Sequence, residues 1–316
     1  MKILITQKLP INPKKHLNDF NLIYNENSFP IKESDLLNYI EDVSGIVSTI
    51  GTKLNRELLE KSSNLKIIAN YGVGYDNIDI DFAKEKNIIV TNTPYVLTES
   101  TAELAITLML NIARKVLEAN KYLIDGEFKG WQPTLFLGDD LYKKTVGIFG
   151  FGRIGQRVAQ ILNVFSCNTI YNSRTRKIHE EQLLNATFVS FEDMLINSDF
   201  IIITAPKSKD TFHRFTINEF QKMKKTSYII NVGRGDIIKE DDLIYALKNR
   251  FISGAALDVY EKEPHIPDEL KNLKNTVLLP HIGSATFETR KNMALLCFDS
   301  IKKVLLDRKK PWNAVF

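Results

Sequence analysis

Two side chains that could handle charge and protons each follow an apolar, strand-like run in the second half of the chain. Arg234 lies between two glycines after the run 228–232, and His281 follows a proline after the run 277–279. Arginine presents a planar fork of donors to a carboxylate or a polarised carbonyl, and histidine donates or accepts a proton near neutral pH. Together they indicate a site that binds an oxyanion and transfers a proton.

A glycine motif precedes both residues. The segment GIFGFGRIG at 147–155 places a Gly-x-Gly-x-x-Gly at Gly150, Gly152 and Gly155, between a strand-like run and apolar residues at helical spacing. The first glycine permits a tight turn, the second lets the backbone approach a pyrophosphate, and the third lets the helix pack on its strand. The positive helix end then faces the phosphates. The motif therefore predicts dinucleotide binding.

Composition limits the class of protein. At 316 residues the sequence is longer than one core usually serves, so two domains are expected. Its net charge of +4 is spread along the sequence, which argues against a nucleic-acid partner. No apolar run suits a signal peptide or a bilayer span, so we expect a cytoplasmic protein without a membrane partner. Cys167 and Cys297 are expected as small core residues, and no residue spacing requires a metal.

Strand and helix patterns alternate from one end of the sequence to the other, which predicts parallel α/β architecture. Strands are expected first at 3–6, 22–24, 45–48, 65–69 and 88–91, with a helix over 33–41. A long helix is expected over 101–120, opened by a capping box of Ser100 and Glu103. Glycines and a proline then predict irregular structure over 126–140. Six strands follow, at 145–149, 168–171, 200–204, 228–232, 254–258 and 277–279, and a last helix over 286–306.

Five segments resemble, in order, the D-isomer-specific 2-hydroxyacid dehydrogenase family, and the resemblance covers nearly the whole sequence. They are NYGVGYDNID at 70–79, the glycine motif, NVGRG at 231–235, LDVYEKEP at 257–264 and LPHIGSAT at 279–286. The glyoxylate/hydroxypyruvate reductase branch is the most similar, through GWQP at 130–133 and SRTR at 173–176.

The resemblance implies two doubly wound parallel-sheet α/β domains. A Rossmann cofactor domain, 99–286, would be inserted in a smaller flavodoxin-like substrate domain, 1–98 and 287–316. Substrate would bind between the domains, and closure would exclude water. The resemblance also implies a homodimer built through the cofactor domains, with the helix 101–120 and the irregular segment after it crossing to the partner.

The resemblance further implies hydride transfer between a nicotinamide cofactor and a small 2-oxo acid. Arg234 would polarise the ketone and bind the carboxylate, and His281 would donate or accept the proton. Glu263 matches the family's carboxylate partner of that histidine, with Glu261 as the neighbouring candidate. The backbone N–H groups of Val73 and Gly74 would bind the substrate carboxylate, together with Arg234.

Further residues are expected to bind the cofactor. Asp258 resembles the residue that holds the nicotinamide carboxamide. Lys207 departs from the family's usual apolar residue, so the resemblance leaves the details of its loop, including the role of His213, open. The expected cofactor-binding residues are Thr101, Gly150, Gly152, Arg153, Ile154, Gly155, Ser173, Arg174, Thr175, Pro206, Thr211, Val232, Asp258 and Gly283.

Cofactor choice can be predicted from the second strand of this domain. An NAD-preferring turn usually carries an acidic residue about 20 residues into the motif, where it binds the ribose 2′-hydroxyl. No acidic residue lies between Gly155 and His179 here, and Ser173, Arg174 and Thr175 follow the strand instead. Hydroxyls and an arginine suit a 2′-phosphate, so NADP is expected as the preferred cofactor, with NAD possible.

Other activities remain open or are disfavoured. A D-lactate-like dehydrogenase, or one for other short D-2-hydroxy acids, remains open, as does an NAD(H)-sensing protein like the family's corepressors. Formate oxidation is disfavoured because that branch pairs its histidine with Gln where this sequence has Glu263. A phosphoglycerate dehydrogenase is disfavoured because the segment after His281 is short. Trp131 is expected either to wall the substrate pocket or to anchor a dimer.

Overall fold

The computed structural model describes residues 1–316, which form two compact units. The first unit comprises Met1–Leu97 and Ser284–Phe316, and the second comprises Thr98–Gly283. Each unit is built on one sheet in which every pair of neighbouring strands is parallel. This confirms the predicted class of two parallel α/β domains, one inserted in the other.

The first unit has five strands in the order β2-β1-β3-β4-β5, the flavodoxin-like order. Its strands are β1 (Lys2–Ile5), β2 (Asn21–Tyr24), β3 (Gly45–Thr49), β4 (Ile67–Tyr71) and β5 (Ile89–Thr91). Its helices are η1 (Pro13–Lys15), α1 (Glu33–Leu36), α2 (Arg56–Glu60), α3 (Ile80–Glu85) and α12 (Phe287–Leu305).

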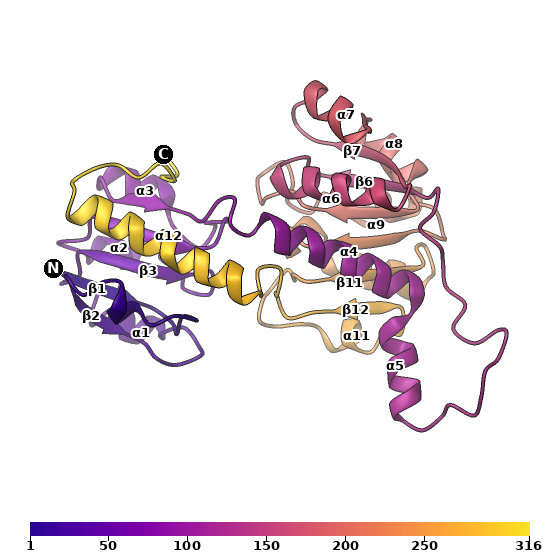
Figure 1. Ribbon diagram of the computed structural model, residues 1–316, viewed down its shortest axis with the longest axis horizontal. Coiled ribbons are helices and arrows are strands. Elements are labelled where there is room, and N and C mark those ends of the chain that lie inside the picture. The colour runs from indigo at the N-terminus through magenta and orange to yellow at the C-terminus, as the bar shows by residue number, and fades with distance from the viewer. The chain divides into compact units, whose positions relative to one another are not determined.

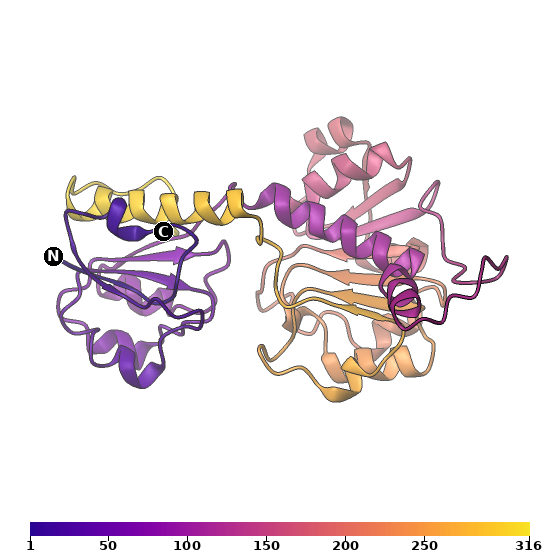
Figure 2. The ribbon, with the colours of Figure 1, turned by 60° about the horizontal axis from the view of Figure 1, so that its bottom comes forward.

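Helix α12 covers one face of this sheet, as Figures 1 and 2 show. Successive strand residues point to opposite faces, so Ile3 and Ile5 pack in one core with Cys297 and Phe298 of α12. Leu4 packs in the other core, with residues of α1, α2 and α3. The C-terminal segment extends the sheet edge, since Val315 N donates to Val90 O at 2.8 Å.

The second unit has seven strands in the order β12-β11-β10-β9-β6-β7-β8. Its strands are β6 (Thr145–Phe149), β7 (Asn168–Asn172), β8 (Ala186–Phe188), β9 (Phe200–Ile203), β10 (Tyr228–Asn231), β11 (Gly254–Leu257) and β12 (Thr276–Leu278). Its helices are α4 (Thr98–Arg114), α5 (Val116–Ile124), α6 (Arg153–Val164), α7 (Ile178–Leu184), α8 (Phe191–Asn197), α9 (Ile217–Lys222), η2 (Gly235–Ile237), α10 (Glu240–Lys248) and α11 (Asp268–Lys271).

Helices lie on both faces of the seven-stranded sheet. Residues of α4 and α6 pack on one face in a core that contains Ile148, Ile202 and Ile230. Residues of α8, α9, α10 and α11 pack on the other, against Ile201 and Ile229. Burial on both faces is typical of parallel sheets and explains the nearly continuous apolar strands. The buried positions of Cys167 and Cys297 confirm that both are core residues.

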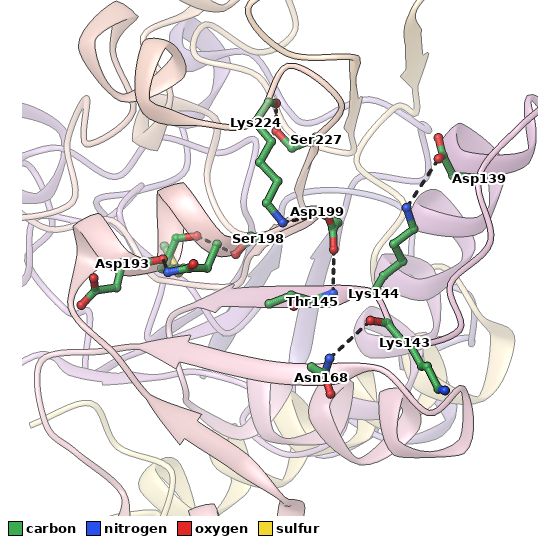
Figure 3. A network of polar contacts seen from close by, with 12 residues as sticks. Asp139, Lys143, Lys144, Thr145, Asn168, Asp193, Ser198, Asp199, Lys224 and Ser227 are labelled. Carbon is green, nitrogen blue, oxygen red and sulfur yellow. Dashed lines mark hydrogen bonds and ion pairs between the residues drawn. The ribbon is translucent and has the colours of Figure 1, made fainter.

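Polar contacts tie together the amino ends of the strands in the second unit (Figure 3). Thr145 N, at the start of β6, donates to Asp199 Oδ2 at 2.8 Å, and Asp199 Oδ1 lies 2.9 Å from Lys224 Nζ. Lys144 pairs with Asp139 at 3.7 Å, and Asn168 Nδ2 donates to Lys143 O. These contacts join the amino ends of β6, β7 and β9, at the end of the sheet opposite the glycine motif.

Two predicted helices differ from those in the structure, and one strand was not predicted. The helix expected over 101–120 begins at Thr98 and breaks at Lys115, whose φ is 52°. Ser100 therefore lies inside α4, and the capping box of Ser100 and Glu103 does not form. Strand β8 was missed, so the sheet has seven strands rather than six, and the helix expected over 33–41 ends at Leu36.

The break at Lys115 has a physical cause in the irregular segment. Asp139 N donates to Ala113 O at 2.9 Å, which satisfies a carbonyl that a continuous helix would have used. Gly138 lies against the same carbonyl so closely that an added Cβ would stand 2.3 Å from its oxygen. The backbone after α4 is therefore held by residues 138–139, and α5 starts in a new direction.

The irregular prediction for 126–140 is confirmed, and this loop reaches beyond the rest of the second unit after α5 (Figures 1 and 2). Helix α5 buries none of its residues. Leu123 and Ile124 are 59% and 74% exposed, and Trp131 in the loop is exposed as well. None of the helices combines the length and the apolar character that crossing a membrane requires.

Candidate functional site

Most of the predicted site residues of the second unit lie at the carboxyl ends of the central strands. The backbone runs outward from β6 to β7 and β8, then returns to build β9 to β12 on the other side of β6. The strand order therefore reverses between β6 and β9. In open α/β sheets a ligand binds at such a switch point, outside the carboxyl ends of the strands.

The glycine motif lies at this switch point and fits a dinucleotide. Gly150 has φ 98°, and an added Cβ there would stand 2.6 Å from Ala205 N in the loop after β9. An added Cβ at Gly155 would stand 2.3 Å from Gly150 O, so helix α6 packs tightly on its strand. Space next to Gly152 is open within 4 Å. The backbone N–H groups of Arg153 and Ile154, in the first turn of α6, can therefore meet a pyrophosphate there.

The turn after β7 lies beside the glycine motif. Gly150 N donates to Asn172 O at 2.9 Å, and the rings of Phe151 and Tyr171 stack at 3.8 Å. Within the turn, Ser173 Oγ donates to Thr175 O at 2.8 Å. Arg174 and Thr175 are exposed. The three residues expected at a 2′-phosphate thus form one exposed turn next to the phosphate loop.

Arg234 follows β10 in a loop that its neighbours hold tightly. Asn231, buried at the end of β10, donates its side-chain N–H to Arg234 O and accepts from Gly233 N. Gly235 lies against the Tyr260 carbonyl, where an added Cβ would stand 1.9 Å from the carbonyl carbon. The guanidinium donates to Gly233 O at 2.8 Å and has a further partner. The loop therefore fixes the backbone from which Arg234 extends.

The structure pairs His281 with Glu263. Their Nδ1 and Oε2 atoms lie 2.8 Å apart, while Tyr260 N donates to the other carboxylate oxygen at 3.0 Å. Burial alone would raise the pKa of Glu263, but the hydrogen bond and charge of His281, the Tyr260 N–H and the charge of Arg234 hold it below its ordinary value. A charged carboxylate on Nδ1 fixes the ring and leaves Nε2 to exchange a proton with a ligand.

Glu261, the alternative partner, faces a different histidine. Its Oε1 is 3.1 Å from His213 Nε2, and its Oε2 accepts from Glu240 N at 3.1 Å. Glu261 therefore joins the loop after β9 to helix α10, and the carboxylate that contacts His281 is that of Glu263. The same loop contains Lys207, which forms an ion pair with Asp236 two residues after Arg234.

Asp258, buried at the end of β11, binds the turn that follows His281. Its two carboxylate oxygens accept from Ile282 N at 2.7 Å and Gly283 N at 2.8 Å. Burial raises the pKa of Asp258, while these N–H groups and the His281 charge act against that rise. Thr101 in α4 donates to Gly283 O at 3.2 Å. Asp258 and Thr101 therefore support His281, and a nicotinamide contact by either one stays a prediction.

The remaining cofactor candidates occupy neighbouring loops. The Thr211 hydroxyl donates to Pro206 O at 2.8 Å and accepts from Ser208 N, so it closes the loop after β9. Val232 is buried directly after β10. Both residues lie at the carboxyl edge of the seven-stranded sheet, next to the switch point. Their contact with a cofactor also stays a prediction.

Val73 and Gly74, expected at the substrate carboxylate, lie in the first unit after β4. Asn92 Nδ2 donates to Val73 O and Asn70 Nδ2 donates to Gly74 O, both at 2.8 Å. The asparagines bind the carbonyl groups of Val73 and Gly74, and the N–H groups of these two residues are available for an oxyanion. Arg234, Glu263 and His281 lie in the second unit.

Sequence reasoning missed the residues that support the site. Asn70 and Asn231 are each at most 1% exposed, although asparagine is a polar residue that is seldom buried. Each begins a segment that carries the family resemblance and stands at a strand end. That combination is the signal that could have identified them. Tyr260, which orients Glu263 through its backbone N–H, gave no such signal because any residue type except proline supplies that group.

Known proteins resemble this one over most of its sequence. The profile of the D-isomer specific 2-hydroxyacid dehydrogenase, NAD binding domain, matches residues 106–283. Glyoxylate reductase from Thermococcus litoralis is 45% identical over 301 residues, which cover 93% of this protein and 91% of that one. Glyoxylate reductase from Thermococcus onnurineus is 42% identical over 300 residues, covering 93% and 90%.

A solved structure resembles the whole molecule. It is the crystal structure of the NADPH-dependent glyoxylate/hydroxypyruvate reductase from Sinorhizobium meliloti in complex with NADP and malonate. The two proteins are 34% identical and superpose with a TM-score of 0.86, over 99% of this one and 96% of that one.

Proposed function

Because the chain belongs to the D-isomer-specific 2-hydroxyacid dehydrogenase family, we propose that it reduces small 2-oxo acids, glyoxylate and hydroxypyruvate above all, to 2-hydroxy acids, with the D configuration where the product is chiral. The protein is an NAD(P)-dependent dehydrogenase. The observation that carries the proposed reaction is the 2.8 Å contact of His281 with Glu263, at the sheet edge that also holds the glycine motif and Arg234. Two relatives are named glyoxylate reductase, and this supports the proposal of a small substrate.

In this proposal each residue has a defined role. Arg234 binds the substrate carboxylate and polarises the ketone, because its fork of donors suits both oxygens. His281 donates its Nε2 proton to the ketone oxygen, while Glu263 stabilises the charged ring through Nδ1. The Val73 and Gly74 N–H groups bind the carboxylate from the first unit. The nicotinamide cofactor supplies the hydride when bound, and the second unit holds it.

A steady-state screen tests the proposal. The rate of NADPH or NADH oxidation is measured with glyoxylate, hydroxypyruvate, pyruvate and 2-oxoisocaproate, and kcat/KM is compared. We expect glyoxylate and hydroxypyruvate to be reduced best. A higher kcat/KM for pyruvate would indicate the D-lactate-like alternative, and a higher value for 2-oxoisocaproate would contradict the small-substrate proposal. Cofactor binding without turnover of any 2-oxo acid would favour a corepressor-like protein.

NADPH is proposed as the preferred cofactor, because the turn after β7 offers Arg174 and two hydroxyl side chains where an NAD-preferring turn carries a carboxylate. Replacing Arg174 by Ala should raise KM for NADPH about tenfold, since one charge-assisted bond is lost, and should leave KM for NADH nearly unchanged. Arg153→Ala is not suitable as a control, because Arg153 lies in the loop proposed to bind the pyrophosphate. The control is therefore Lys209→Ala, at an exposed position. A wild-type enzyme with higher kcat/KM for NADH would overturn the preference.

A homodimer is proposed as the working assembly. The support is the apolar surface of α5, which buries none of its residues, and the long loop after it. Both segments belong to the second unit, and the resemblance implies a dimer formed through that unit. A second copy of the protein is the proposed occupant of this surface, because a helix whose leucines and isoleucine face water is costly in a monomer.

A further inference from the structure

A carboxylate binds one of the two arginines in the turn after β7, residues 173–177. Arg176 Nε lies 2.9 Å from Glu181 Oε1, and its terminal nitrogen lies 2.9 Å from Oε2, so the pair is bidentate. Glu181, in helix α7, also accepts from Tyr171 OH at 2.7 Å. The hydrogen bonds of Arg176 and Tyr171 hold the pKa of Glu181 below its ordinary value, so it is charged at neutral pH.

The two arginines of the turn therefore differ. Arg174 is exposed, and none of the ion pairs in the structure involves it. The Arg176 guanidinium is directed to α7, over the Phe188 ring at 6.0 Å. The Glu181 side chain is only 12% exposed, against 58% for Arg176, so the contact is better sheltered than an ordinary surface pair.

This arrangement lies within reach of the proposed cofactor position. Tyr171, which binds Glu181, stacks on Phe151 inside the glycine motif. Its hydroxyl also accepts from Lys177 N at 2.8 Å, at the end of the same turn. Tyr171 thus links Glu181 both to the turn that starts at Ser173 and to the loop proposed to bind the pyrophosphate.

We propose that Glu181 sets the selectivity between cofactors with and without a 2′-phosphate, by holding the Arg176 guanidinium away from the phosphate. The inference rests on the proposed NADPH binding at this turn. Glu181 is a positioning residue, because it acts through Arg176. With Glu181 charged, one arginine serves the 2′-phosphate and the other is neutralised, so the enzyme retains use of NADH.

The physical reason is a competition for one guanidinium. A bidentate carboxylate uses the same donors that would bind phosphate oxygens, and its own charge repels a phosphate nearby. Glu181→Gln removes the charge but keeps the shape and an acceptor for Tyr171. The released Arg176 can then bind the 2′-phosphate, and one charge-assisted hydrogen bond is worth about a tenfold change in affinity.

The test measures fragments of the cofactor directly. Dissociation constants of adenosine 2′,5′-bisphosphate and of adenosine 5′-monophosphate are determined by calorimetry for the intact wild type, Glu181→Gln and Glu180→Gln. We expect Glu181→Gln to bind the bisphosphate about tenfold more tightly, with no change for the monophosphate. Glu180, the preceding residue in α7, has no ion pair, so Glu180→Gln controls for the change in net charge.

A double-mutant cycle identifies the route of the effect. In the Arg176→Ala background, Glu181→Gln should give no gain, because the arginine through which it acts is missing. Tyr171→Phe, which loses the hydrogen bonds to Glu181 and from Lys177 N but keeps the ion pair, should leave the selectivity at its wild-type value. An equal gain in Tyr171→Phe, an equal gain in Glu180→Gln, or no gain in Glu181→Gln would each overturn the inference.

The outcome is separable from that of the proposed function. If the wild type binds both fragments equally but Glu181→Gln gains for the bisphosphate, the NADPH preference fails and the inference stands. If the wild type prefers the bisphosphate and Glu181→Gln does not change it, the inference fails and the preference stands. Melting temperatures of all variants confirm that they are folded.

Discussion

At the scale of single residues, the His281 and Glu263 contact is supported from both sides. Tyr260 N binds one oxygen of Glu263, and Asp258 binds the backbone that follows His281. The segment that follows β11 therefore fixes one carboxylate and one imidazole. Such support keeps reacting groups in place without a rearrangement during the reaction.

Loss of the Glu263 carboxylate should slow the reduction. A neutral carboxamide in Glu263→Gln no longer gives Nδ1 of His281 a charged partner, and that ring is the proposed proton donor. The kcat for glyoxylate should fall by about tenfold or more. The control is Glu261→Gln, whose carboxylate faces His213. An unchanged kcat in a folded Glu263→Gln variant would show that Glu263 does not govern the proton donor.

Another cationic residue should not be able to replace Arg234. Arg234→Lys keeps the charge but loses the planar fork, so kcat/KM for glyoxylate should fall by about a hundredfold or more. Arg250→Lys, at an exposed turn, is the matched control. Near wild-type turnover by a folded Arg234→Lys variant would remove Arg234 from the proposed mechanism.

At the scale of elements, Asp199 joins the amino ends of β6 and β9. Burial would raise the pKa of Asp199, but the Lys224 hydrogen bond, the Thr145 N–H and nearby lysine charges hold it below its ordinary value. A carboxyl whose pKa is lowered by folding stabilises the fold above its unfolded pKa, about 4, and loses that contribution as pH falls through the folded pKa.

Asp199→Asn should therefore lower the melting temperature by about 2–4 °C at neutral pH, the effect of roughly 1 kcal/mol in a unit of this size. The difference from the wild type should begin to shrink below about pH 4, where the carboxyl of the unfolded chain takes up a proton, and should vanish below the lowered pKa of Asp199 in the folded protein. Asp140→Asn, at an exposed position in the loop before β6, serves as control. A difference that persists unchanged into acid would mean that charge does not account for it.

The elements also show what the sequence could and could not predict. The glycine motif was predictable because strand, turn and helix each leave a local pattern, and the fold class followed from their alternation. Strand β8 has three residues, too few for a period to be detected. The break at Lys115 depends on residues 138–139, which are distant in sequence and satisfy the carbonyl of Ala113.

The site divides in the same way. Arg234 and His281 stand in segments recognisable by residue type and position at strand ends. The support from Asn231, Asp258 and Tyr260 N depends on three-dimensional contacts, which spacing along the sequence does not encode. The contact of Arg176 with Glu181 could not be predicted either, because the sequence of the turn shows only that it is basic.

At the scale of the whole molecule, the exposed surface of α5 predicts association. Light scattering at micromolar concentration should give about twice the monomer mass of 36.2 kDa. Leu123→Glu with Ile124→Glu should return the mass to that of one monomer, because charges would be buried in the interface. Val164→Glu is the control, since Val164 is 85% exposed on α6. A monomer mass for the wild type would contradict the dimer.

The position of α12 has a consequence for synthesis on the ribosome. Strands β1 to β5 emerge first, yet one face of their sheet is covered by Ala294, Cys297, Phe298 and Ile301, which emerge after the entire second unit. Until then Ile3, Ile5 and Ile67 have no helix over them. The unit that begins to be made first is therefore the last to be completed, and during synthesis its apolar face is the surface that a chaperone would have to shield.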